Sequence, residues 1–381
     1  MKPHALLGVV LALLAATGVL PQAAPADGGA RHQNGHGMVF VQTNELHGNR
    51  IVVYSQGADG SLTETGRFAT GGLGGIAAPG TESDRLASQG SLVFASRHSL
   101  LLAVNAGSNT VSAFRVQGGE LRLVDVQPSG GEFPASIAVH ENLVYVLNAG
   151  GAGSVQGFVI RGHGLAPLDG SSRSLGLANT NPPDFLTSPG QVGFTPDGQK
   201  LIVTTKASGS AIDVFQVGHD GRLSSNPAVN PSATPVPFAF TFDDLGRLVL
   251  GEAGTSSVTT YTINGNGTLA DARSLSDNQV ALCWIQRVGD VYYVANTGSN
   301  TLSAYRIDAA GEPSLVTPSG IVATTEAGPI DLTASSDGRY LYGETGTAGT
   351  VDEYRVNADG TLTKVGVVTG LPPGIEGIAA T

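Results

Sequence analysis

A seven-bladed, antiparallel β-propeller is the fold that this sequence predicts, and three observations predict it. One phrase returns seven times: an apolar run, a small polar segment, then an aliphatic residue, preceded by Ser or Thr in five of the seven copies, and three positions later an aromatic residue. These aromatic residues recur every 44 to 60 residues. Short strand-like runs with a period of about 40–50 residues are typical of propeller blades. The seven aromatic residues are Tyr54, Phe114, Phe158, Phe215, Tyr261, Tyr305 and Tyr354.

Composition agrees with a fold built from short strands and many tight turns. The chain has 54 glycines among 381 residues, about twice the usual share of roughly 7%. Glycine permits the positive φ angles that tight turns require. Long amphipathic helical patterns are missing, and 41% of the residues are hydrophobic while only 13% are charged. We therefore expect one large all-β core.

The fourth repeat serves as the template for a blade of four strands. Its turns are Pro196-Asp197-Gly198 and His219-Asp220-Gly221, which contain the residues that tight turns favour. The strands predicted between these turns are A at 191–195, B at 201–205, C at 211–217 and D from Leu223 onward. Two connections are longer than the others, at 71–89 and 168–189, and long loops in compact folds are often functional.

The two ends of the predicted ring complement each other. The first repeat enters directly at strand B, Met38–Gln42, and lacks a strand A. The last eight residues, 374–381, read as a strand A that nothing follows. We expect the C-terminal strand to complete the first blade, because this removes an exposed sheet edge.

The N-terminal region predicts export. Lys2 and His4 precede an apolar stretch from Ala5 to Leu20, and small residues follow around 23–26. This pattern is typical of a secretory signal peptide, here residues 1–26, and the apolar stretch is too short for a membrane span. We expect a disordered tail at 27–37 and a single propeller domain at 38–381. A lone cysteine, Cys283, excludes an internal disulfide.

Charge limits the classes of partner. The net charge of −11 argues against nucleic acid, which requires a basic face. We expect a secreted or periplasmic monomer that binds a small molecule and has no membrane span, and the sequence leaves protein partners open.

Several segments resemble the bacterial β-propeller lactonase family, which includes 6-phosphogluconolactonase and the 3-carboxymuconate-cyclising enzymes. The matching segments are 88–94, 105–116, 192–198 and 328–332, and the resemblance covers 38–381. It implies a seven-bladed propeller and a lactonase or cyclase that uses histidine, arginine and acidic residues around one channel mouth.

The histidines depart from that family pattern. His98 and His140 fall in A–B turns, and His163 and His219 fall in C–D turns. Both kinds of turn lie on the face opposite the B–C and D–A loops. Only His47, in the first B–C loop, can reach the face where we expect the site.

Two rings of residues are predicted at that face, one residue from each blade in each ring. The ring at the end of strand B contains Asn44, Asn105, Asn148, Lys206, Glu252, Asn296 and Glu344. The ring before strand A contains Gln89, Ser136, Gln191, Phe238, Trp284, Asp331 and Glu376. Converging polar groups with a few aromatic rings are what a small-molecule site requires.

Each candidate has a structural alternative. The asparagines at 105, 148 and 296 fit turns as well as ligands. Lys206 and Glu252 could form either a structural or a functional ion pair. A surface ion pair stabilises a fold by only about 0–1 kcal/mol, so stability alone is a weak reason for its presence. Asp331 and Glu376 could be solvated, bind a cation or act as a base. Trp284 could stack on a sugar or lie in the core. Arg85 and Arg173, in the long loops, could hold a carboxylate or phosphate.

Three functions follow as hypotheses. In the first, Lys206, Glu252, Asp331 and Glu376 catalyse hydrolysis or cyclisation of a small lactone or carboxylate. In the second, a non-catalytic propeller binds a small ligand or cation. The residues expected to bind the ligand are Asn44, Gln89, Asn105, Asn148, Gln191, Trp284, Asn296 and Glu344. In the third, the propeller is a protein-interaction scaffold. No motif indicates a cofactor or a specific metal site, although a divalent cation such as Ca²⁺ could occupy the channel.

Overall fold

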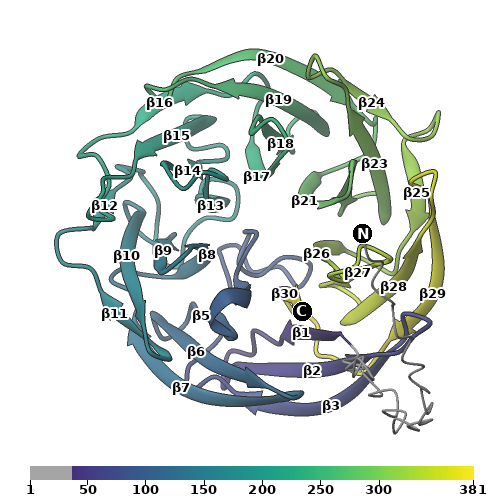
Figure 1. The fold of residues 1–381 in the computed structure, drawn as a ribbon, viewed down its shortest axis with the longest axis horizontal. Helices are drawn as coiled ribbons and strands as arrows, with labels where there is room; N and C mark the ends of the chain where they lie inside the picture. Colours follow the sequence, from purple (N-terminus) through teal and green to yellow (C-terminus); the bar gives the residue numbers. More distant parts are fainter. Residues whose placement is uncertain (1–36) are drawn as a thin grey trace, which may run out of the picture. The chain divides into compact units, whose positions relative to one another are not determined.

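The computed structural model describes residues 37–381, which form seven antiparallel sheets around a central axis (Figure 1). The seven-bladed propeller predicted from the repeats is therefore confirmed. The predicted signal peptide, and the predicted tail except Gly37, lie outside the described residues. No helix in the described part of the chain has the length and apolarity needed to cross a membrane.

Four blades come first along the chain, each with its strands ordered from the axis outward. Blade one has β30 (Ile378–Ala380), β1 (Met38–Gln42), β2 (Arg50–Gln56) and β3 (Leu62–Ala69). Blade two has β4 (Leu92–Ala95), β5 (Leu100–Asn105), β6 (Thr110–Gln117) and β7 (Glu120–Pro128). Blade three has β8 (Pro134–His140), β9 (Leu143–Asn148), β10 (Ser154–Arg161) and β11 (Gly164–Pro167), with β12 (Arg173–Ser174) also on β10. Blade four has β13 (Gln191–Phe194), β14 (Lys200–Thr204), β15 (Ala211–Gln216) and β16 (Ala228–Pro231).

Three further blades complete the ring. Blade five has β17 (Pro237–Phe242), β18 (Leu248–Glu252), β19 (Ser257–Ile263) and β20 (Leu269–Ser276). Blade six has β21 (Leu282–Val288), β22 (Val291–Asn296), β23 (Thr301–Ile307) and β24 (Pro313–Leu315), with β25 (Ile321–Thr324) also on β23. Blade seven has β26 (Pro329–Ala334), β27 (Tyr340–Thr345), β28 (Thr350–Val356) and β29 (Leu362–Val368). A short 3₁₀ helix, η1 (Ser96–His98), forms the A–B turn of blade two.

The core lies between neighbouring blades. All seven repeat aromatic residues are buried, each on the third strand of its blade. Tyrosines on second strands also join blades, because their hydroxyls donate to carbonyls in the C–D turn of the next blade. Tyr293 donates to Gly360 at 2.9 Å, and Tyr342 donates to Gly60 at 2.9 Å. These bonds satisfy hydroxyls that burial would otherwise leave without partners.

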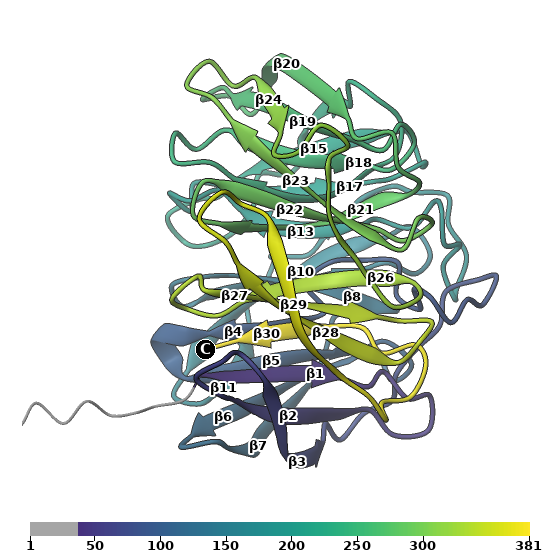
Figure 2. The same cartoon turned by 90° about the vertical axis from the view of Figure 1, so that its right-hand side faces the viewer.

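The ring closes as the sequence predicts. Strand β30 pairs with β1, with Val39 opposite Ala380 and Val41 opposite Ile378. The Met38 N–H donates to Thr381 Oγ1 at 2.9 Å. The C-terminus therefore ends at the face that carries the A–B turns, at the left of Figure 2. This closure gives blade one its fourth strand.

One predicted strand begins later than expected. Leu223 makes only an isolated bridge to Val217, and the outer strand of blade four, β16, starts at Ala228. Pro227 directly precedes it. Proline cannot donate to a β-ladder, so pairing between 223 and 228 is interrupted.

Deleting residues 374–381 should destabilise the whole ring. The deletion removes β30, exposes the inner edge of β1 and removes the Glu376 side chain from the axis. We expect the thermal midpoint to fall by more than about 10 °C, since a loss of about 1 kcal/mol already shifts it by a few degrees. Circular dichroism melting would measure this, and an unchanged midpoint would show that ring closure does not depend on β30.

Candidate functional site

A short segment crosses the centre of the propeller on the face of the B–C and D–A loops. This axial segment, Leu86–Gln89, belongs to the first long connection. Its backbone is held by several blades: Leu86 N–H donates to Glu376 Oε2 at 2.5 Å, and Trp284 Nε1 donates to the Ser88 carbonyl at 3.0 Å. Leu86, Ala87 and Ser88 are fully buried.

Gln89, the last residue of the axial segment, contacts three more blade positions. Its carbonyl accepts from Ser136 Oγ at 2.6 Å, and its own N–H donates to the Gly190 carbonyl at 3.0 Å. Its side-chain oxygen accepts from Ile285 N–H at 3.0 Å. The axial segment is thus tied to blades one, three, four and six, and it closes the channel at this face.

The two long connections are joined to each other. Ala78 N–H donates to the Pro183 carbonyl at 2.8 Å, and Phe185 N–H donates to the Ala78 carbonyl at 2.8 Å. Both connections lack extended secondary structure, so these bonds and those of Lys206 determine how they cover the axis.

Lys206 holds both connections with its ammonium group. Nζ donates to the Ala87 carbonyl at 2.7 Å, to the Phe185 carbonyl at 2.8 Å and to Ser188 Oγ at 2.8 Å. It also lies 5.2 Å from the centre of the Phe238 ring, a cation–π distance. Burial lowers the pKa of Lys206 to about 8, against the opposing charge of Asp84. The side chain is only 2% exposed, so solvent cannot reach it while the connections are in place.

Four buried carboxyl groups surround the axial segment: Asp84, Asp331, Glu344 and Glu376. The Ala87 N–H donates to Asp84 at 2.7 Å, and the Asp84 and Glu376 carboxyls are close enough to perturb each other's pKa. Burial raises the pKa of Asp84 to about 6, with Lys206 opposing. Burial and the neighbouring acids raise the pKa of Asp331, Glu344 and Glu376 well above the ordinary values.

Predicted cation binding gains no support from the arrangement of these acids. Within residues 37–381, no group of three or more His, Cys, Asp or Glu side chains has an arrangement that could hold a metal ion. Burial disfavours the ionised form of each of these carboxyls and raises its pKa.

The strand register corrects the ring predicted at the end of strand B. Residues that face the start of strand C are equivalent across blades, and in three blades this residue is Thr43, Thr205 or Thr345. Asn44 and Lys206 each follow the equivalent residue of their blade by one position, and Glu344 precedes the equivalent residue of its blade by one position. The prediction places all three at the equivalent position. One residue reverses the direction of a side chain in a strand, and so Lys206 and Glu344 turn toward the axis, while Asn44 bonds Gly75 of the first connection.

The asparagines of that ring bind neighbouring parts of the blades: Asn105 and Asn296 bind the strand after their own B–C turn, and Asn148 binds the loop before β8. Asn105 Nδ2 donates to Ser112 Oγ at 2.8 Å, and Asn296 Nδ2 donates to Ser303 Oγ at 2.9 Å. Asn148 Nδ2 donates to the Ser129 carbonyl at 3.2 Å. Asn105 and Asn296 also donate to the threonine at the end of their own B–C turn. These contacts are structural and agree with the alternative that asparagines shape the turns.

Glu252 lies in blade five, in a cage of hydroxyl groups. Its carboxylate accepts from Ser232 Oγ at 2.5 Å, Thr234 Oγ1 at 2.6 Å and Tyr261 OH at 2.8 Å, and also from Thr259. No ion pair joins it to Lys206 in the described chain. The predicted Lys206–Glu252 pair is therefore wrong, because each side chain is fully engaged with other groups.

Most of the second predicted ring is buried in the packing around the axial segment, whereas Gln89 and Gln191 are half-buried. Trp284 is fully buried and lies edge-on to Phe238, with ring centres 5.0 Å apart. Gln191 is half-buried and exchanges two hydrogen bonds with the backbone of Phe240, at 2.6 and 3.2 Å. Ser136 and Gln89 bind each other. These residues position the centre of the propeller and leave little room for a ligand there.

The accessible concavity on this face lies beside the axial segment. This His47 pocket, of about 570 Å³, is lined by the blade-one B–C loop, the first connection and the loop before β30. Its polar side chains are Glu45, His47, Arg50, Glu82 and Arg85. His47, the one histidine that the sequence places on this face, is therefore in a pocket.

Arg85 is the most enclosed cation of the His47 pocket. Its side chain is 12% exposed and forms an ion pair with Glu82. Nη1 donates to the Asn44 carbonyl at 3.4 Å, while the buried Nε has no partner in the described chain. A Cβ at Gly374 would collide with Arg85, so glycine is required there. Arg173, by contrast, donates to backbone carbonyls at Ser224 and Gly170.

Sequence reasoning missed Asp84. It lies in an irregular connection, where no repeat marks it, and its acidic neighbours Asp331 and Glu376 come from the far end of the sequence. The length of the connection was the one available signal.

Comparisons with known proteins agree with this fold. Residues 17–162 match the family model described as "Lactonase, 7-bladed beta-propeller", which confirms the resemblance to the β-propeller lactonase family. The search of curated proteins finds no match.

Solved structures of similar fold cover nearly the whole chain. A protein from Lactobacillus plantarum has a TM-score of 0.72 at 16% identity, covering 91% of this chain and 99% of its own. A proposed 6-phosphogluconolactonase from Bacteroides fragilis has a TM-score of 0.69 at 17% identity, covering 92% and 99%. The periplasmic gluconolactonase of Pseudomonas aeruginosa has a TM-score of 0.65 at 19% identity, covering 89% and 98%. These likenesses establish the fold.

Replacing Lys206 by Met should destabilise the protein and loosen both long connections. The change leaves two buried carbonyls and a hydroxyl without their donor, which we expect to cost about 2–4 kcal/mol. Urea unfolding and amide hydrogen exchange across 78–89 and 183–188 would measure both effects. Arg122→Met, which removes an exposed cation from the outer strand β7, should change neither, and equal behaviour of the two variants would contradict the role given to Lys206.

The buried carboxyls should make the protein more stable as the pH falls from 7.5 to 5. A carboxyl with a raised folded pKa stabilises the fold fully below its unfolded pKa, and that contribution is lost as the pH rises through the folded pKa. Lys206, with a pKa lowered to about 8, is mostly protonated in this window, and it opposes the slope of the carboxyls only near pH 7.5. The surface carboxyls with lowered pKa values, such as Asp197 and Asp337, act mainly below about pH 4.

Glu344→Gln isolates this effect, because an amide oxygen can still accept from Gly377 N–H. We expect its plot of unfolding free energy against pH to be shallower by up to about 1.4 kcal/mol per pH unit. Chemical denaturation at several pH values measures the slope, with the exposed Glu312→Gln as control. Identical slopes in wild type and Glu344→Gln would show that Glu344 titrates normally.

Proposed function

We propose that this protein is a lactonase-like hydrolase that opens a small lactone in the His47 pocket. The observation that carries the proposal is the composition of this pocket: one imidazole, two guanidinium groups and two carboxylates line about 570 Å³ at a single channel face. Histidine, arginine and acidic residues at one mouth are what the family resemblance implies. The volume also suits a single sugar-sized ring.

The pocket can supply the chemistry that lactone hydrolysis needs. Attack of water on the ester carbonyl requires a base for the proton and a donor for the developing oxyanion. His47 is exposed and free to act as the base, whereas the enclosed Arg85 guanidinium, oriented by Glu82, suits the oxyanion. Arg50, at the exposed rim, would pair with a carboxylate or phosphate on the substrate.

The residues predicted to be catalytic take a different place in this proposal. Lys206 and Glu376 act as positioning residues, because they hold the axial segment whose preceding residue is Arg85. Asp331 belongs to the buried acid cluster, and in this proposal its role is to help raise the pKa of Glu344 and Glu376. Glu252 would act only through the stability of blade five.

Export to the periplasm or the medium is part of the proposal. It rests on the signal-like pattern of residues 1–26, and one structural neighbour is named a periplasmic gluconolactonase.

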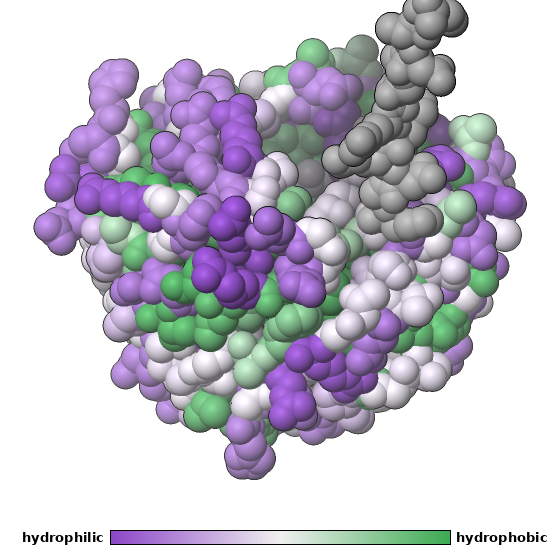
Figure 3. All heavy atoms as spheres, turned by 60° about the horizontal axis from the view of Figure 1, so that its bottom comes forward, coloured by the Kyte–Doolittle hydropathy of each residue, from purple (hydrophilic) through white to green (hydrophobic). Residues whose placement is uncertain are grey.

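A scaffold function draws less support. Large exposed hydrophobic residues are spread over separate blades, for example Val229 on β16, Leu245 in blade five and Val280 before β21. In Figure 3, which turns the rim of β3 and β7 toward the viewer, one hydrophobic patch lies near the centre of this face, and the other hydrophobic groups are scattered among hydrophilic ones. Docking surfaces usually need larger contiguous patches.

Removing either pocket group should abolish lactone opening. We expect His47→Gln and Arg85→Lys each to lower kcat/KM by at least about 100-fold on the best substrate, the range associated with a lost base or oxyanion donor. A pH-stat assay over a panel of aldonolactones, corrected for spontaneous hydrolysis, measures this. Arg85→Lys keeps the charge but not the two-pronged geometry, so it limits damage to folding.

Matched controls lie elsewhere on the propeller. His219→Gln, in an exposed C–D turn, and Arg122→Lys, on the outer strand β7, should retain full activity. Wild-type protein that opens none of the lactones, or pocket variants that stay as active as the controls, would overturn the proposal.

A further inference from the structure

The other end of the channel is a second concavity, on the face of the A–B turns. One part, of about 360 Å³, lies between the turns of blades two and three, and a second part, of about 350 Å³, follows the inner strands of blades three, four and five. Val139, His140 and Pro196 line both parts. They therefore adjoin, and together they form what we call the A–B mouth.

The wall of the A–B mouth is unusually aromatic. Phe94, Phe194, Phe240 and Phe242 all line it from the innermost strands. Phe94, Phe194 and Phe242 are only partly buried, whereas most other aromatic rings of the propeller are fully buried. Partly exposed phenyl rings in one concavity leave apolar surface that a ligand ring could cover.

These rings are held from behind. Phe94 packs on Phe40 with centres 6.1 Å apart, and Phe240 meets Phe242 edge-on at 5.9 Å. The Phe240 ring packs directly on the backbone of Gly193, because a Cβ at position 193 would lie only 2.7 Å from this ring. The wall is thus formed before any ligand arrives, which lowers the entropy that binding costs.

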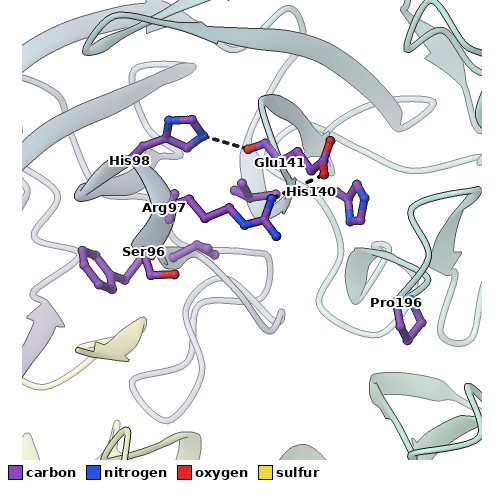
Figure 4. A pocket seen from close by; sticks show the side chains of 10 residues that line it. Ser96, Arg97, His98, His140, Glu141 and Pro196 are labelled. Atoms are coloured by element: carbon purple, nitrogen blue, oxygen red, sulfur yellow. Dashed lines mark hydrogen bonds and ion pairs between the residues drawn. The ribbon is translucent and has the colours of Figure 1, made fainter. Parts of the chain in front are cut away.

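The rim of the A–B mouth carries the polar groups. Figure 4 shows the Arg97 side chain, from the blade-two turn, reaching toward His140 and Glu141 of blade three. Arg97 pairs with Glu141 at 3.4 Å, and both side chains are largely exposed, at 74% and 66%. Such an exposed pair is worth about 0–1 kcal/mol, so a ligand carboxylate could replace Glu141 at little cost.

His140 is the fixed polar group beside Arg97. Its ring lies 5.7 Å from the Phe194 ring and packs against Gly198, where a Cβ would collide with it. No hydrogen bond from its imidazole to any residue of 37–381 is found. His98, in contrast, is engaged, because its Nε2 lies 3.0 Å from the Glu141 carbonyl.

We propose that the A–B mouth is a binding site for a small aromatic carboxylate, separate from the His47 pocket. The ligand ring lies against Phe94 and against Phe194, whose ring is next to His140. Its carboxylate lies at the rim, where the Arg97 guanidinium takes both oxygens in place of Glu141 and the His140 imidazole donates beside it. The aromatic ring of the ligand makes the apolar contact, and the side chains of Arg97 and His140 make the site prefer an anion.

Calorimetric titration with sodium 1-naphthoate tests the proposal on the full-length protein. We expect saturable binding of one equivalent, and at least about tenfold weaker binding to Arg97→Ala and His140→Gln, since each loses a charge-assisted contact. Neutral 1-naphthamide, which keeps the ring, and hexanoate, which keeps the carboxylate, should each bind at least about tenfold more weakly than naphthoate.

Variants away from the A–B mouth show whether naphthoate binds at this site or elsewhere on the propeller. Arg122→Ala and His163→Gln remove an exposed arginine and an exposed histidine from outer parts of the blades and should bind naphthoate as the wild type does. Melting curves confirm that each variant is folded. The proposal is overturned if naphthoate does not bind, if Arg97→Ala binds it unchanged, if hexanoate binds equally well, or if Arg85→Lys rather than Arg97→Ala abolishes binding.

Discussion

The hydrogen bonds of the axial segment govern the centre of this propeller. Four residues, Leu86–Gln89, lie where seven inner strands converge, and groups from blades one, three, four and six bind their backbone. Buried amides must have partners, so the blades have to supply them at fixed positions. The two long connections, the acid cluster and the orientation of Arg85 all follow from that requirement.

Electrostatics at the centre show how a buried polar network can be tolerated. Four carboxyls and one ammonium lie out of contact with water. Full ionisation of all five would be costly in so apolar an environment. Burial raises the pKa of all four acids, which limits the charge that the centre has to bury. The main role of the network is therefore to hold the axial segment in place through hydrogen bonds.

The fold was predictable from the sequence, and the centre was only partly so. Seven repeats, their buried aromatic residues and the strand that closes blade one are local patterns, which a period of about 40–50 residues reveals. The site depends on register. B–C turns contain four to six residues between their paired positions, and residues of different types occupy these positions. An alignment by residue type therefore places Asn44, Lys206 and Glu344 one residue away from the equivalent position. Asp84 depends on contacts between distant segments, which no repeat encodes.

The pairing of β1 with β30 has a consequence for how the protein is made. Met38 and Thr381, joined by a hydrogen bond, are 343 residues apart. Strand β30 leaves the ribosome after every other described strand, so the earliest sheet waits with an open flank through the rest of synthesis. Contacts between such distant segments form slowly, and an unpaired flank invites other chains. Shielding the nascent chain until its final strand emerges would thus be a requirement of the architecture itself.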